Sequence, residues 1–99
     1  MSKRTAITAE AAESLAIQAL TYLAAEPEQL GRFLAITGIG PERMRVVARE
    51  PNFLAGLLDY VASDEPLLIA FAAQAGIDPA EIERACAVLG RQRWQRDAP

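Results

Sequence analysis

The chain has 99 residues, 52% of them hydrophobic, and a formal net charge of −3, which together indicate one soluble-type domain with enough apolar residues to fill a core. The sequence contains no histidine and a single cysteine, Cys86, which excludes His/Cys zinc sites, cysteine–histidine nucleophiles and serine–histidine triads. We therefore expect neither an enzyme nor a bound cofactor or metal, and the pI near 4.9 disfavours a dedicated nucleic-acid binder.

Proline and glycine divide the chain into six predicted helices, because each falls where a helix begins or ends. Abundant alanine and leucine with few β-branched residues favour an all-α fold, a compact bundle of six helices. In chain order the predicted helices are residues 8–26, 27–38, 41–50, 51–63, a fifth that starts at the 63–66 cluster, and 79–90. The domain covers residues 1–99, with residues 1–7 and 91–99 expected to be flexible ends.

The fifth and sixth helices carry the densest apolar residues. The fifth is apolar on nearly every face, so we expect it to be the central, most enclosed element. Its apolar residues are Leu67, Leu68, Ile69, Phe71 and Ala73. In the sixth, Cys86 lies on an apolar stripe with Ile82 and Leu89, which predicts a small core residue and not a reactive thiol.

The second half of the chain repeats the first at an offset of 38 residues. Between residues 20 and 41, nine of 22 positions are identical to the residue 38 places later, against roughly two or three expected by chance in such a composition. The identical residues are Leu20, Tyr22, Ala24, Leu30, Phe33, Ala35, Gly38, Ile39 and Pro41. The chain is therefore predicted to be two tandem three-helix units, about 8–50 and 51–90.

Each unit contains a corner of the form Gly-Ile-X-Pro. Gly38 and Gly76 are placed where a helix ends in a left-handed residue, and Pro41 and Pro79 at the first position of the next helix. The residue before the proline, the N-cap, is Gly40 in the first unit and Asp78 in the second.

The first corner, "ITGIGP", also resembles the hairpin of helix-hairpin-helix modules, which bind a nucleic-acid backbone through bare amides. Asp78 at the equivalent position would occupy those amides and repel phosphate, so both corners are interpreted as structural. Nucleic-acid binding through Gly38–Pro41 and the following arginines stays the alternative, and it predicts salt-sensitive binding.

The charged and aromatic residues give further candidates for partner binding. Arg43, Arg45 and Arg49 form a basic face in the third helix, whereas the matching part of the second unit is acidic. This face is either simply solvated or meets an acidic surface on a partner or a second copy. Trp94, in the arginine-rich stretch "RQRWQR", is either part of a free end, folded back on the core, or a partner contact.

Tyr22 and Tyr60 occupy equivalent positions in the two units. They are predicted to lie at the edge of the core with their hydroxyls reaching water.

The chain resembles a family of short bacterial proteins catalogued as domain of unknown function 3572. The resemblance rests on "LAIQALTYLAAEPEQLGRFLAITGIGP", "PNFLAGLLDYVASDEPLLIAFAAQAGIDP" and the helix that follows, about residues 15–90. It implies a compact helical domain and supplies no activity, cofactor, partner or functional residue.

The sequence as a whole leaves the function unknown and favours a non-enzymatic protein-interaction domain, with a homodimer as one form, because alanine-rich faces let helices pack closely. The N-terminus has glutamates where a signal peptide needs an apolar run, and the longest uncharged apolar stretch, residues 66–77, is too short to span a bilayer. With its single thiol, the protein is expected in the cytoplasm and not in a membrane.

Overall fold

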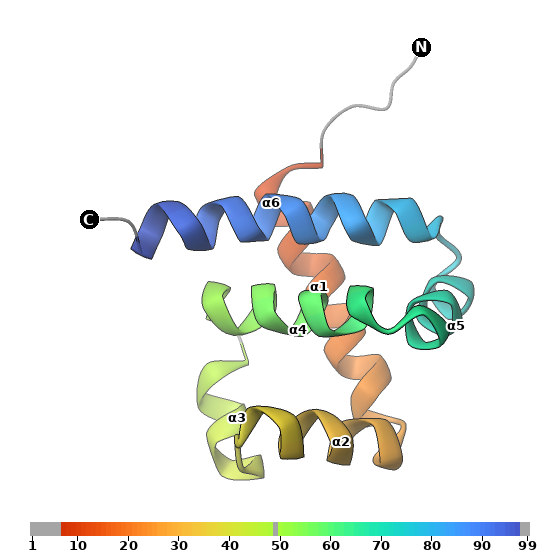
Figure 1. Cartoon of the computed structure of the whole chain (residues 1–99), viewed down its shortest axis with the longest axis vertical. Helices are drawn as coiled ribbons and strands as arrows, with labels where there is room; N and C mark the ends of the chain where they lie inside the picture. The colour runs from red at the N-terminus through yellow and green to blue at the C-terminus, as the bar shows by residue number, and fades with distance from the viewer. Residues whose placement is uncertain (1–6, 49, 98–99) are drawn as a thin grey trace.

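The protein is an all-α bundle, as the sequence predicts. The computed structural model describes residues 7–48 and 50–97, apart from the side chains of Pro41 and of residues 92–97. Its helices are α1 (Ala9–Ala24), α2 (Pro27–Thr37), α3 (Pro41–Val47), α4 (Pro51–Ser63), α5 (Glu65–Ala75) and α6 (Pro79–Asp97) (Figure 1). Strands are absent from this part of the chain. The molecule is flat, with extents of 43 × 38 × 19 Å.

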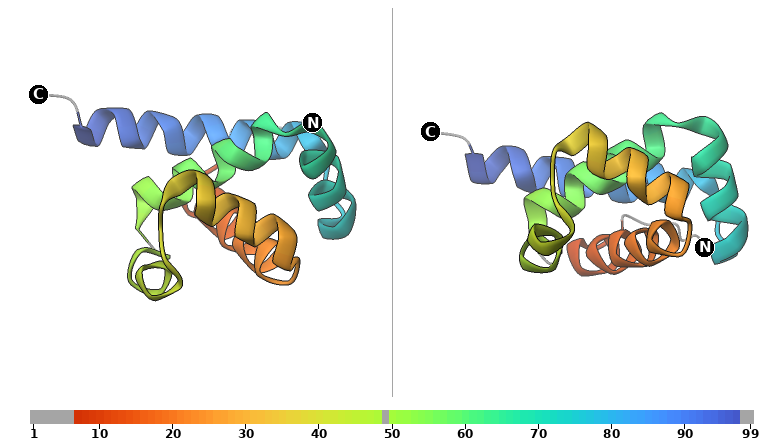
Figure 2. Two further views of the ribbon diagram at one scale, coloured as in Figure 1. Left: turned by 60° about the horizontal axis from the view of Figure 1, so that its bottom comes forward. Right: turned by 90° about the horizontal axis from the view of Figure 1, so that it is seen from below.

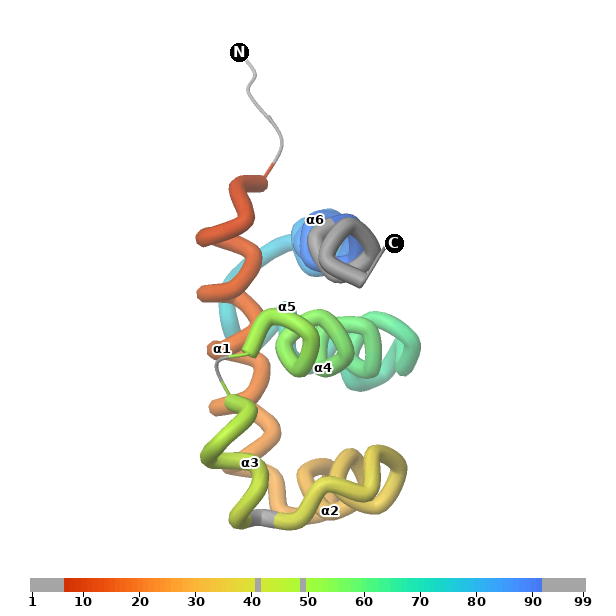
Figure 3. The backbone as a smooth tube through the Cα atoms, turned by 90° about the vertical axis from the view of Figure 1, so that its left-hand side faces the viewer, coloured from red at the N-terminus to blue at the C-terminus, as the bar shows by residue number. Residues whose placement is uncertain are grey.

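Three helices are stacked along a fourth. The helices α6, α4 and α2 follow one another down the length of α1, which packs against all three (Figures 1 and 3). The short α3 connects α2 to α4 at one end of the molecule, and α5 lies at the opposite end (Figure 2). Helices from both predicted units therefore share one core, while the repeat itself stays a prediction.

The stacking depends on a row of alanines in α1. Ala12, Ala16 and Ala19 recur at helical spacing and are completely buried, as is Leu23 one turn later. Since the distance between packed helix axes is set by the side chains at the contact, this row lets α4 and α6 approach α1 closely. The alanine-rich face on which the expected homodimer rested is thus used inside the molecule.

The central helix is α4 and not α5. It buries five residues and packs against α1, α5 and α6. The expectation that α5 is the most enclosed element is wrong, because α5 is a terminal layer: Leu67 and Phe71 are buried, but Ile69 is 52% exposed. Because α5 is apolar on nearly every face, its sequence did not indicate which face would pack against other helices.

Two helices end well away from their predicted ends, whereas α1 and α2 match their predicted ranges to within two residues. The predicted end of the sixth helix was Gly90, but α6 continues to Asp97, since Gly90 does not adopt the left-handed conformation that ends a helix. The helix α3 ends at Val47 and not at residue 50, because Glu50 precedes Pro51 and is extended (φ −76°, ψ 133°).

Side chains cap the starts of α1 and α5, as Asp78 also does that of α6. The Thr8 hydroxyl accepts a hydrogen bond from the Ala11 N–H (3.0 Å), and the Asp64 carboxylate accepts one from the Leu67 N–H (3.2 Å). Asp64 also lies 3.9 Å from Arg32 of α2, an exposed ion pair of small energetic value.

Both corner glycines are left-handed, with φ of 75° at Gly38 and 71° at Gly76, and they are the positive-φ residues of the described chain. After α5, the N–H of Gly76 bonds to Ala73 O (3.3 Å) and that of Ile77 to Ala72 O (3.0 Å), which is the Schellman pattern.

The first corner closes differently. The Gly38 N–H donates a hydrogen bond to Leu34 O (2.8 Å), and the Ile39 N–H donates one to the Thr37 hydroxyl (3.3 Å). The equivalent of Thr37 in the second unit is Ala75, which has no acceptor, so a single side chain accounts for the difference between the two caps.

Three aromatic pairs cross between the predicted units, and two of them are equivalent. Tyr22 packs on Phe71 with ring centroids 5.5 Å apart, and Tyr60 packs on Phe33 at 5.2 Å. The partners correspond at the 38-residue offset, so each tyrosine contacts the phenylalanine of the opposite unit. Such reciprocal contacts are the pattern that two-fold related units produce.

Replacement of Gly76 by alanine is expected to lower the free energy of unfolding by about 1–2 kcal/mol, the usual penalty for a left-handed non-glycine residue. A Cβ there would meet no neighbouring atom, so the penalty comes from the backbone alone. The matched control is Gly31→Ala inside α2, also in open space, which should stabilise by about 0.5–1 kcal/mol. Urea denaturation measures the free energy of unfolding of both variants. Equal effects of the two substitutions would contradict the left-handed conformation of Gly76.

Candidate functional site

The corner before α3 presents a short helix to solvent. Gly40 is extended (φ −80°, ψ 162°) and provides no side-chain cap, but α3 is only seven residues long. In the second corner the Asp78 carboxylate accepts a hydrogen bond from the Ala80 N–H (2.9 Å), so an amide that a phosphate would need is already bonded there. This geometry agrees with the structural interpretation of the corner at Asp78.

Two of the four candidate partner-binding residues fall within the described structure. Arg43 and Arg45 are exposed on α3. Arg49 and the side chain of Trp94 lie outside the described residues. The structure therefore places a basic α3 at one end of the molecule but does not bring the four candidates together.

An apolar groove lies between α2 and α4, with a volume of about 310 Å³. Its lining residues are Phe33, Ile36, Thr37, Ile39, Asn52, Phe53, Gly56, Leu57, Asp59 and Tyr60. The aromatic residues form its floor: Phe33 packs edge-on against Phe53 at 5.8 Å and against Tyr60. Ile36, on the C-terminal turns of α2, is 66% exposed, so a large aliphatic side chain stands uncovered beside the groove.

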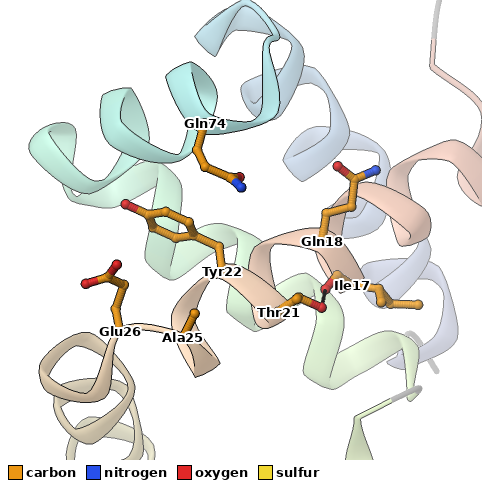
Figure 4. A pocket seen from close by; sticks show the side chains of 7 residues that line it. All are labelled: Ile17, Gln18, Thr21, Tyr22, Ala25, Glu26 and Gln74. Carbon is orange, nitrogen blue, oxygen red and sulfur yellow. Dashed lines mark hydrogen bonds between the residues drawn. The ribbon is translucent and has the colours of Figure 1, made fainter.

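A second groove lies between α1 and α5, with a volume of about 410 Å³, and glutamine, glutamate and threonine side chains stand among the apolar surface that lines it; we call it the polar groove. The lining residues are Ile17, Gln18, Thr21, Tyr22, Ala25, Glu26 and Gln74 (Figure 4). The Thr21 hydroxyl donates to Ile17 O (3.1 Å) within α1. No described group bonds to the side chains of Gln18, Glu26 or Gln74, which leaves their polar atoms available in the groove.

The two grooves correspond to each other at the 38-residue offset. Residues 18, 21 and 22 of α1 become 56, 59 and 60 of α4, and residue 36 of α2 becomes 74 of α5. Each groove is thus built beside one crossed tyrosine–phenylalanine pair. The side chains differ: Gly56 and Ile36 make one groove apolar, and Gln18 and Gln74 make the other polar.

Sequence reasoning predicted the repeat but missed both grooves. The signal was present in the identical tyrosines and phenylalanines, but only the fold shows that these residues pair between units and open a groove beside each pair. The side chains differ between the units at two pairs of equivalent positions, 18 with 56 and 36 with 74. These differences determine which groove carries hydrogen-bond acceptors and which is apolar.

Cys86 of α6 contacts Asp59, one of the residues that line the apolar groove. Its thiol lies 3.7 Å from the Asp59 carboxylate, to which it donates a weak hydrogen bond. Burial raises the pKa of the Cys86 thiol to about 11, with further increases from the Asp59 charge and hydrogen bond and from Glu83. The thiol is therefore protonated and unreactive near neutral pH, in agreement with the sequence interpretation.

The two tyrosines differ in their surroundings. The Tyr60 hydroxyl is buried and has no hydrogen-bond partner among the described groups, so the expectation that it reaches water is wrong. The reason is that Phe33 packs against its ring and α2 covers it. Tyr22 is half-buried and lines the polar groove.

The comparison with protein families decides the affiliation of the chain. The family described as "Protein of unknown function (DUF3572)" matches residues 9–92. The chain belongs to this family. The match covers all six helices except the end of α6, and the family description supplies no function for any residue. Neither the curated proteins nor the solved structures yield a match.

Two further properties concern membranes and metals. Among the described residues, no helix combines the length and apolarity needed to cross a bilayer. Over the same part of the chain, histidine, cysteine and acidic side chains form no group of three that would suit a metal ion.

Alkylation of Cys86 by iodoacetamide at pH 8 is expected to be about a hundredfold slower than that of an ordinary thiol, because a pKa two units higher reduces the thiolate by that factor. Asp59→Asn removes a neighbouring charge, lowers the pKa of Cys86 and should speed the reaction. Glu83→Gln, which removes the smallest contribution to the raised pKa of Cys86, is the control and should increase the alkylation rate less than Asp59→Asn does. An Asp59→Asn rate equal to wild type across pH 7–10 would contradict the role of this carboxylate.

Tyr60→Phe is expected to raise the free energy of unfolding by roughly 1 kcal/mol, because it removes a hydroxyl that is buried without a partner. Tyr22→Phe is the matched control and should be nearly neutral, since Tyr22 borders an open groove. Thermal and urea denaturation measure both. Destabilisation by Tyr60→Phe would show that the hydroxyl is bonded in solution.

Proposed function

We propose that this chain is a non-enzymatic protein-interaction domain that forms a homodimer through the apolar groove between α2 and α4. The observation that carries the proposal is Ile36, 66% exposed beside a groove whose floor is aromatic. Exposed apolar side chains that border a groove rimmed by polar residues are typical of protein-binding surfaces.

The low burial of α2 and α3 supports this choice of surface. Among the described side chains, α2 buries only Phe33 and α3 buries only Val47. Val46 of α3 is 70% exposed. Because the alanine row of α1 is already covered by α4 and α6, Ile36 and Val46 are the apolar side chains left to bury at the end of the molecule formed by α2 and α3.

Charge complementarity supports a second copy as the occupant. The helix α3, with Arg43 and Arg45 exposed, stands at the end of the groove where α2 finishes and α4 begins (Figure 1), and Asp59 lines the groove. In a two-fold dimer every contact occurs twice, so arginines of one copy approach the carboxylate of the other at both ends.

Neither of the other function classes has comparable support. Support for an enzyme is weak, because the sequence has no histidine, the most frequent general acid or base, and the Cys86 thiol is held protonated. Nucleic-acid binding, the alternative, would rest on Arg43, Arg45 and the amides of a seven-residue helix in a chain of net charge −3. A cytoplasmic location belongs to the same proposal and is supported by the single thiol.

Ile36→Glu is expected to weaken dimerisation at least about tenfold, because a carboxylate would have to be desolvated in the apolar contact. Ile69→Glu is the matched control: Ile69 is 52% exposed on α5, at the other end of the molecule, and its replacement should leave dimerisation unchanged. Sedimentation equilibrium with circular dichroism separates association from folding.

Arg45→Glu should also weaken the dimer, and more strongly at low salt. A wild-type chain that remains monomeric at high micromolar concentration would overturn the homodimer, as would equal effects of Ile36→Glu and Ile69→Glu.

A further inference from the structure

We propose that the polar groove between α1 and α5 is a binding site for a guanidinium group, presented by an arginine side chain of a polypeptide. The site is separate from the apolar groove between α2 and α4, and the proposal does not depend on the homodimer. It rests on the acceptors that line the groove, on the tyrosine ring among them and on the absence of any cationic side chain from the lining.

The acceptors come from two helices and the loop that follows α1, with Gln18 and Glu26 on opposite sides of Tyr22 (Figure 4). Gln18 comes from α1, Gln74 from α5, and Glu26 from the turn between α1 and α2 (Figure 4). The two amides each offer a carbonyl oxygen, and Glu26 offers a carboxylate. None of these three side chains bonds to a described group. A ligand that donates several hydrogen bonds in different directions and carries a positive charge fits this set.

Tyr22 gives the groove its planar element. Its side chain extends between Gln74 and Glu26 (Figure 4), and its ring is supported by Phe71 at 5.5 Å, with the two planes inclined at 50°. A planar cation stacks favourably on such a ring. Since guanidinium is planar and has five N–H donors in a fixed arrangement, it fits the ring and the acceptors better than the compact ammonium of lysine.

The corresponding apolar groove shows that these features are not imposed by the fold. It has the same tyrosine, as Tyr60, but Gly56 stands in place of Gln18 and Ile36 in place of Gln74. The two amide side chains therefore belong to the α1–α5 groove alone. With a volume of about 410 Å³, this groove is within the range of small-ligand sites and accepts a whole arginine side chain.

An arginine within a polypeptide is favoured over the free amino acid because Glu26 would repel a free α-carboxylate. The probes are therefore N-acetyl-arginine amide, free arginine, N-acetyl-lysine amide and N-acetyl-citrulline amide, which has the arginine shape without the charge. Binding is followed by two-dimensional NMR through the side-chain amide signals of Gln18 and Gln74, which report directly on the groove.

N-acetyl-arginine amide is expected to shift both signals saturably with a millimolar dissociation constant, and the citrulline analogue to bind at least about tenfold more weakly. Glu26→Gln should weaken binding several-fold, whereas Glu28→Gln, the same charge change on an exposed residue of α2 outside the groove, should have little effect. Free arginine is expected to bind more weakly than the blocked form, because of its α-carboxylate.

Three results would overturn the proposal: no saturable shift at tens of millimolar probe, equal binding of the citrulline and arginine analogues, or equal effects of Glu26→Gln and Glu28→Gln. Ile36→Glu is the remaining control, because it alters the corresponding groove and should leave arginine binding intact. A monomeric chain that still binds the arginine probe would separate this site from the proposed dimer.

Discussion

The arrangement of the whole molecule depends on the close contact that the buried alanines of α1 allow. Ala12, Ala16 and Ala19 are completely inaccessible, and α4 and α6 both pack on the face that they form. Larger side chains at these positions would separate the helices and strain the layer, which typically destabilises by about 1–3 kcal/mol. Because α2, α4 and α6 are all stacked along α1, the positions of both grooves follow from this contact.

On this scaffold, one local arrangement is used twice with different chemistry. Each crossed aromatic pair, Tyr22 with Phe71 and Tyr60 with Phe33, supports a groove where a helix of one predicted unit meets a helix of the other. The pairs provide rigid aromatic surface, and the positions around them determine polarity. Two differences, Gln18 against Gly56 and Gln74 against Ile36, distinguish the groove with more acceptors from the apolar one.

The sequence predicted the features that depend on neighbouring residues. Helix starts and the left-handed Gly38 and Gly76 follow from backbone geometry within a few residues, and they were correctly placed. The central helix was assigned wrongly, because burial depends on which faces find partners in three dimensions. The grooves were missed for the same reason: they are formed by residues 33 and 60, or 22 and 74, which only the fold brings together.

The contact between α1 and α6 also has a consequence for biosynthesis. The alanine face of α1 is covered only once α6 has been synthesised, since α6, the last of the six helices in chain order, supplies one of the two surfaces that pack on it. The nascent chain therefore carries exposed apolar surface until α6 has left the ribosome, a condition under which chaperones engage growing polypeptides. Truncation within α6 would accordingly leave α1, about 70 residues earlier in the chain, without one of its two packing surfaces.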